Sequence, residues 1–164
     1  MTRNIAREIA VHMIFSLSFE DINAEELLER ELTKERFAEL EPDMPLYTQY
    51  PNEKQEQYIR ELVRGVFAHG PELDDYISRY AVGWSFARIP RMAAAIMRTA
   101  MYEVLYMPDV PNAAAINAAV EIAKNYEPKE VVSFVNGILG TFVRSECEEI
   151  PEKSAEKAVE GAEG

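Results

Sequence analysis

The sequence predicts an all-α protein of about seven helices. Its 164 residues are 48% hydrophobic, which is enough to bury the core of one globular domain. Apolar residues recur three and four positions apart in successive segments, the spacing of one helix face. The chain has only seven glycines and little of the apolar–polar alternation that is typical of strands. These observations together favour helices throughout.

The clearest helical pattern lies in residues 110–142, where we expect two paired helices. In the first helix the apolar positions are Ile116, Ala119, Val120 and Ala123. In the second they are Val131, Phe134, Val135, Ile138, Leu139 and Phe142. Pro111 and Pro128 lie where a helix tolerates proline, at its beginning. Asn136 and Gly137 interrupt the second apolar run, and we expect an interhelical hydrogen bond and close helix packing there.

Residues 4–19 form the first expected helix, with a wide apolar face. Arg3 and Arg7 lie one turn apart at its beginning, and Phe15 projects roughly 80° around the helix from Arg7. Two cations beside an aromatic ring suit a phosphate and a stacked base. The alternative is a solvated arginine pair and an ordinary core phenylalanine, which the spacing alone favours.

An acidic helix over 24–40 and a loop over 41–52 follow. The loop contains three prolines, which disfavour regular structure and predict mobility. Its Tyr47 and Tyr50 are expected to attach it to the body of the protein or to meet a partner, and attachment is the more common role.

Three further helices are expected over 53–68, 71–81 and 90–106. His69, Gly70 and Pro71 form a stop signal in which the glycine would adopt the left-handed cap conformation. Trp84 has the character of a buried anchor between the second and third of these helices. On the third, Arg98 and Glu103 lie off the apolar stripe.

The net charge of −12 is concentrated in two segments. Residues 20–56 hold 12 acids and 4 bases, residues 146–164 hold 7 acids and 2 bases, and the remainder has a net charge of +1. We therefore expect one domain over 1–145, containing an acidic insertion at about 24–52, and a disordered acidic tail over 146–164. A broad basic footprint for nucleic acid is missing from the composition, but a local binding face is compatible with it.

The sequence shows no motif for an enzyme, cofactor or metal. It has no glycine-rich phosphate loop, no HExxH and no GxSxG, and a hidden active site would require a pocket with converging polar groups. Its single cysteine, Cys147, excludes an intramolecular disulfide and fits the reducing cytoplasm. No apolar run approaches the length of a membrane span, and the N-terminus lacks the features of a secretory signal.

Several short motifs resemble the NusB family of bacterial transcription antitermination factors. The opening helix contributes Ala6, Arg7, Glu8 and Ala10, and the centre contributes Trp84, Met97, Arg98 and residues 102–105. The strongest likeness is in residues 115–117, 120–124 and 134–139, which read AIN, VEIAK and FVNGIL. The resemblance implies an all-α bundle of two packed helical subdomains. It also implies that the protein binds boxA-type RNA of nascent ribosomal transcripts together with the small-subunit ribosomal protein NusE. The resulting complex would join elongating RNA polymerase, and the protein would catalyse no reaction.

The resemblance also assigns residues. Arg3 and Arg7 would contact phosphate, Phe15 would stack or pack near a base, and Lys124 and Glu130 would border the RNA. Lys124 is equally well placed to cap the carbonyl end of its helix. The partner surface would involve the helix 98–106, and its candidate residues are Arg98, Tyr102 and Glu103.

Two other functions are compatible with the same fold. One is a protein–protein interaction module with weak or no RNA binding, which the acidic balance and the small number of arginines favour. The other is the RNA-binding accessory domain found in some ribosomal RNA methyltransferases. Because no α/β catalytic domain follows residue 145, we expect no methyl transfer from this chain.

Overall fold

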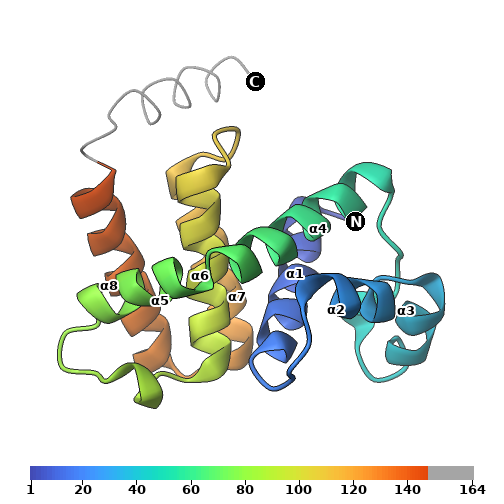
Figure 1. The fold of residues 1–164 in the computed structure, drawn as a ribbon, viewed down its shortest axis with the longest axis horizontal. Coiled ribbons are helices and arrows are strands. Elements are labelled where there is room, and N and C mark those ends of the chain that lie inside the picture. The colour runs from blue at the N-terminus through green and yellow to red at the C-terminus, as the bar shows by residue number, and fades with distance from the viewer. Residues whose placement is uncertain (148–164) are drawn as a thin grey trace. The chain divides into compact units, whose positions relative to one another are not determined.

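The computed structural model describes residues 1–147, whose regular elements are all helices, and the predicted all-α fold is confirmed. This part of the chain contains eight α-helices and two short 3-10 helices, and it contains no strand. Their bounds are α1 Arg3–Leu17, α2 Ala24–Glu31, α3 Lys34–Leu40, η1 Pro45–Tyr47, α4 Glu53–Ala68, α5 Gly70–Tyr80, η2 Phe86–Arg88, α6 Arg91–Tyr106, α7 Asn112–Tyr126 and α8 Lys129–Glu146 (Figure 1). None of these helices is long and apolar enough to cross a membrane. Most of the predicted tail, residues 148–164, lies outside the described part.

The chain divides into two compact helical units, Met1–His69 and the part from Gly70 onward. In the first unit, α1 packs along α4, and α2 contacts both helices (Figure 1). The core comes from the apolar faces that the sequence spacing predicts. Its fully buried residues include Ala6, Ile9, Ala10, Leu27, Leu28, Ile59, Leu62 and Val63.

The prediction of a single helix over 24–40 is wrong, because the structure has two helices there, α2 and α3. Leu32 leaves the helical conformation with φ −95° and ψ 65°, and its buried side chain stays in the core. Thr33 then caps α3, its side-chain oxygen accepting a hydrogen bond from the backbone N–H of Arg36 at 3.1 Å. A threonine cap competes locally with helix continuation, which explains the break.

The proline-rich loop is attached to the first unit by its tyrosines, as the sequence predicts. Tyr47 lies in η1 and is only 5% exposed, and Tyr50 donates a hydrogen bond to the carbonyl of Leu32 at 3.1 Å. Both rings meet Phe37 of α3 edge to face, with centroids 5.0 Å apart in each pair. These aromatic contacts therefore hold the loop against α3 without regular backbone hydrogen bonding.

The junction between α4 and α5 differs from the predicted stop signal. His69 does occupy the C-cap of α4, but α5 begins at Gly70 without a left-handed residue. In the described residues, only Gly83 has positive φ, at +85°. Pro71 falls in the first turn of α5, where its missing N–H costs little, so the chain begins a new helix immediately.

In the second unit, α6 packs against α5, α7 and α8. The predicted pair of helices over 110–142 is confirmed as α7 and α8, which also pack on each other. Phe142 is fully buried and meets Tyr76 of α5 edge to face, with ring centroids 5.1 Å apart. The buried residues of α8 are Val135, Ile138, Leu139 and Phe142, four of the six expected positions.

Three expectations about burial in the second unit are wrong. Trp84 is 46% exposed and packs on Phe134 at 4.9 Å between ring centroids, and it follows a turn in which Gly83 has positive φ. Asn136 and Gly137 lie on the exposed face of α8, so they mediate no contact between buried helix faces. Glu103, expected off the apolar stripe, is completely buried on α6.

Gly83 and Gly137, which are both exposed, should respond oppositely to replacement by alanine. Gly83→Ala forces a left-handed backbone on a residue with a Cβ and should lower the free energy of unfolding by about 1 kcal/mol. Gly137→Ala adds a methyl group in open space within a helix and should raise it by up to about 1 kcal/mol. Urea unfolding followed by circular dichroism measures both variants, and a shift of the same sign in both would contradict the described backbone.

Candidate nucleic-acid interface

The two N-terminal arginines of α1 share one aromatic ring. Thr2 caps the helix by accepting a hydrogen bond from the backbone N–H of Ile5 at 3.2 Å, which fixes the first turn. The Arg3 guanidinium carbon lies 4.4 Å from the centroid of the Tyr58 ring on α4, and that of Arg7 lies 5.8 Å from it. The packing of α1 on α4 therefore assembles a cation–aromatic cluster from residues more than 50 positions apart.

The two arginines differ in exposure. Arg3 is exposed, whereas Arg7 is only 4% exposed and donates a hydrogen bond from Nη1 to Asn4 Oδ1 at 2.6 Å. The sequence predicts a phosphate contact for both residues. The geometry gives a direct path to solvent only to Arg3, while Arg7 adds positive charge from beneath the surface.

Phe15 lies at the other end of α1, with Phe19 beside it. Phe15 is half-buried, and its ring meets Phe19 edge to face at 4.9 Å between centroids. Phe19 is 57% exposed, so this aromatic pair has a face in solvent. Phe19 was not predicted from the sequence, although its four-residue spacing from Phe15 could have identified it.

Lys124 and Glu130 lie on the second unit, on either side of the turn between α7 and α8. Lys124 is exposed in the last turn of α7 and forms an ion pair with Glu121, with Nζ 2.8 Å from Oε1. An exposed pair of this kind contributes at most about 1 kcal/mol, so the ammonium group can exchange its partner for a phosphate. Glu130 is exposed in the first turn of α8, where the helix dipole favours a negative charge.

The three candidate partner-binding residues on α6 are largely occupied within the second unit. Arg98 forms an ion pair with Asp74 of α5, with Nε 2.6 Å from Oδ1, and its side chain is 16% exposed. Tyr102 is 8% exposed and lies beside Tyr106, with ring centroids 5.3 Å apart. The completely buried Glu103 offers no surface to a partner in this conformation.

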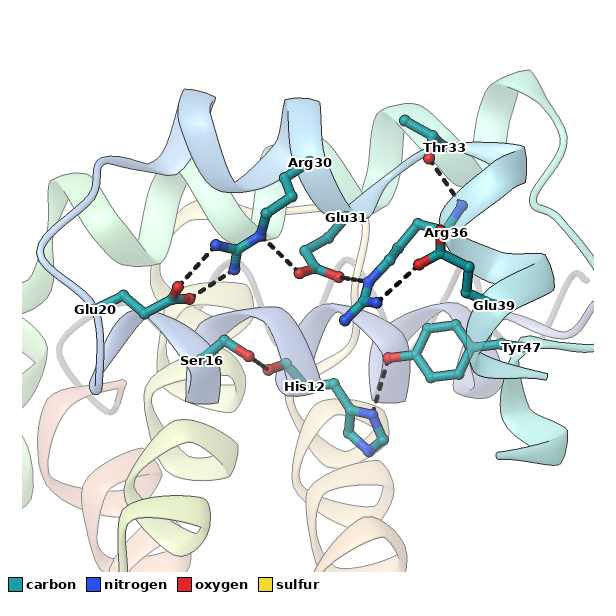
Figure 2. Close-up of polar contacts among 9 residues, drawn as sticks. All are labelled: His12, Ser16, Glu20, Arg30, Glu31, Thr33, Arg36, Glu39 and Tyr47. Atoms are coloured by element: carbon teal, nitrogen blue, oxygen red, sulfur yellow. Dashed lines mark hydrogen bonds and ion pairs between the residues drawn. The ribbon is translucent and has the colours of Figure 1, made fainter. Parts of the chain in front are cut away.

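The acidic insertion forms a chain of ion pairs that the sequence did not predict. Arg30 binds both carboxylate oxygens of Glu20 at 2.6 and 2.7 Å, and it also binds Glu31 (Figure 2). Glu31 continues to Arg36, which also binds Glu39. These residues, with Thr33 and Glu35, line an open hollow of about 550 Å³. The hydrogen bonds from Arg30 hold the pKa of Glu20 below its usual value, so this carboxylate stays charged at neutral pH.

Beneath this hollow, His12 of α1 lies 3.0 Å from the Tyr47 hydroxyl through its Nδ1 (Figure 2). Burial lowers the pKa of His12, and the nearby negative charge of Glu8 opposes that shift. Burial also raises the pKa of Tyr47. Both groups are therefore neutral near pH 7, and the pair attaches η1 to α1. Among residues 1–147, no group of three His, Cys, Asp or Glu side chains is arranged to hold a metal ion.

Comparisons with known proteins identify one family. Residues 4–144 match the model of the NusB family. Transcription antitermination protein NusB of Carboxydothermus hydrogenoformans is 39% identical over 154 residues, which cover 94% of this chain and 100% of that protein. The solved structure of T. maritima NusB is 29% identical, with a TM-score of 0.73 over 88% of this chain and 92% of that one.

A solved complex of the antitermination factors NusB and NusE with double-stranded RNA contains a chain of the same fold. It matches with a TM-score of 0.70 at 20% identity, over 87% of this chain and 96% of that one. At this identity the likeness establishes the fold.

The half-buried His12 should make stability depend on pH. Below pH 6.5 the unfolded chain binds a proton that the folded His12 resists, so the free energy of unfolding should fall as the pH is lowered, by at most about 1.4 kcal/mol per unit for this one proton. We expect His12→Gln to reduce this dependence between pH 7 and pH 5.5. Glu20 and Glu25 do not titrate in this range, because their arginine partners lower their pKa values. Identical pH profiles of unfolding for the two proteins would contradict the role given to His12.

Proposed function

Because this chain belongs to the NusB family, we propose that it is a transcription antitermination factor that binds boxA-type RNA together with the ribosomal protein NusE. The match to the family over residues 4–144 carries the proposal. In this role the chain binds and assembles rather than catalyses, acts on elongating RNA polymerase through the complex, and works in the cytoplasm. Residues 1–145 serve as one functional domain, with 24–52 as an acidic insertion.

Each of the two helical units contributes residues to the proposed RNA contacts. On the first unit, Arg3 contacts phosphate, Arg7 adds positive charge, and Phe15 packs near a base. The exposed Arg3 guanidinium and the partly exposed Phe15–Phe19 pair support these roles. On the second unit, Lys124 and Glu130 border the RNA, and their exposure around the α7–α8 turn supports that placement.

The proposed surface for NusE lies on α6 around residues 98–106. Tyr106 is 38% exposed there, and its hydroxyl donates to both carboxylate oxygens of Glu72, at 2.7 and 2.9 Å. The partly exposed edge of Arg98 belongs to the same helix. Tyr102 and the buried Glu103 then support this surface from within the unit.

A protein–protein interaction module with weak or no RNA binding is the second candidate. The burial of Arg7 and the net charge of −12 favour it, because they leave few cations for phosphate contacts. In that case NusE would supply most of any RNA-binding surface in a complex.

Fluorescence anisotropy with a labelled boxA RNA and a scrambled control distinguishes the two functions. The titration is run with and without NusE at two salt concentrations. The antitermination role predicts tighter binding of boxA than of the scrambled RNA, strengthened by NusE and weakened by salt. Binding of NusE with no RNA in any mixture would support the interaction module.

The arginine pair should carry a measurable share of the RNA affinity. The double variant Arg3→Ala with Arg7→Ala should weaken boxA binding at least about fivefold and lower the slope of log affinity against log salt by about 1. Circular dichroism should show unchanged helicity. Arg64→Ala is the matched control, because Arg64 lies on α4 of the same unit and is paired with Glu25. Unchanged affinity in the double variant, or an equal loss in the control, would remove the N-terminal site from the proposal.

A further inference from the structure

We infer that Tyr58 is a positioning residue that holds the two N-terminal arginines in unequal roles, with Arg3 presented to an RNA phosphate and Arg7 acting as an internal support. The inference rests on the proposed RNA binding and deepens it by dividing the work within the arginine pair. It follows from the shared ring, the difference in exposure and the ion-pair pattern of the first unit.

Tyr58 fixes the arginines from another helix. Its side chain is 6% exposed on α4, so the packed interior sets the position of its ring. Arg3 lies closest to this ring, at 4.4 Å, and Arg7 lies at 5.8 Å. One turn earlier on α4, Gln55 donates a hydrogen bond to the carbonyl of Met1, just ahead of α1. Helix α4 therefore holds both the entry to α1 and the first arginine side chain.

Like charges four residues apart destabilise a helix unless something offsets their repulsion. The electron-rich face of Tyr58 provides part of that compensation within the protein. Asn4, which accepts a hydrogen bond from Arg7, provides another part. Because arginine cannot lose its proton in proteins, both positive charges persist, and a phosphate bound at the exposed Arg3 would reduce their repulsion further.

Arg3 differs from the other surface arginines of its unit in its interaction partner. Arg30, Arg36, Arg60 and Arg64 each form an ion pair with a glutamate. Within the described residues, Arg3 forms no such pair and contacts the Tyr58 ring instead. An exposed guanidinium that is oriented but not neutralised suits a phosphate, which can accept two parallel hydrogen bonds from it.

A double-mutant cycle tests the inference. Tyr58→Leu removes the ring and keeps an apolar side chain, and Tyr58→Phe is the control that keeps the ring. In the full chain, Tyr58→Leu should weaken boxA RNA binding about three- to tenfold and lower the salt slope, while Tyr58→Phe should stay within about twofold of the natural protein. In an Arg3→Ala background, Tyr58→Leu should have almost no further effect, because it acts through Arg3.

The NMR chemical shifts of the Arg3 side chain provide a readout without RNA. The natural protein and Tyr58→Phe should show the ring-current shift of a guanidinium over an aromatic face, and Tyr58→Leu should lose it.

Independent effects of Tyr58→Leu and Arg3→Ala on RNA affinity would overturn the inference, because a general destabilisation by Tyr58→Leu would act regardless of Arg3. The absence of a ring-current shift in a chain that binds RNA would overturn the inference and leave the proposed function intact. A chain that shows the shift but binds no RNA would refute the proposed function, and with it the RNA role of Tyr58.

Discussion

The packing of α1 against α4 is the contact on which the first unit and its candidate RNA face depend. Helix α1 buries the apolar side chains of Ala6, Ile9 and Ala10 completely, and it packs on α4. The opposing helix is amphipathic and buries Ile59, Leu62 and Val63. Burial of this apolar surface is the favourable term that orders α1. At one edge of the same contact, Tyr58 meets the arginines, so the hydrophobic core also determines where the positive charge is presented.

The arginines of the first unit fall into two groups, those in ion pairs with glutamates and those that contact an aromatic ring. The acidic insertion uses its arginines internally, as in the chain of ion pairs from Glu20 through Arg30 and Glu31 to Arg36. The arginines of these pairs are well exposed to solvent, so each pair contributes little to stability, but together they neutralise the charges of Arg30 and Arg36. Arg3 remains outside this network, on an aromatic ring. A protein with a strongly negative total charge can therefore still offer a local cation to a phosphate.

Periodicity predicted the helices well, because each helix buries one continuous face. The first helix and the pair over 110–142 were found within a few residues of their bounds, and Tyr47 and Tyr50 attach their loop as expected. The break at Leu32 was missed because a single threonine cap begins a new helix within a segment that was predicted to be one acidic helix. Trp84 was misplaced because residue type suggested burial, whereas the residue lies in the connection after α5, at the surface and 46% exposed.

The candidate site was harder to predict, because its decisive contacts join distant parts of the chain. Residue type and family resemblance identified Arg3 and Arg7, but not the difference in their exposure. Tyr58 was not singled out from the sequence, since nothing local links it to a residue 55 positions earlier. The burial of Glu103 was likewise invisible, because a helix packed on several sides has no polar face to predict.

Ultraviolet cross-linking of boxA RNA to the full chain in the presence of NusE, with mass spectrometry of the cross-linked peptides, tests the central claim most directly. If the packing of α1 on α4 presents an RNA face, cross-links should appear in α1, at or near Arg3 and Phe15, and Tyr58→Leu should reduce those near Arg3. Cross-links confined to α2 and α3, with none in α1, would contradict the account.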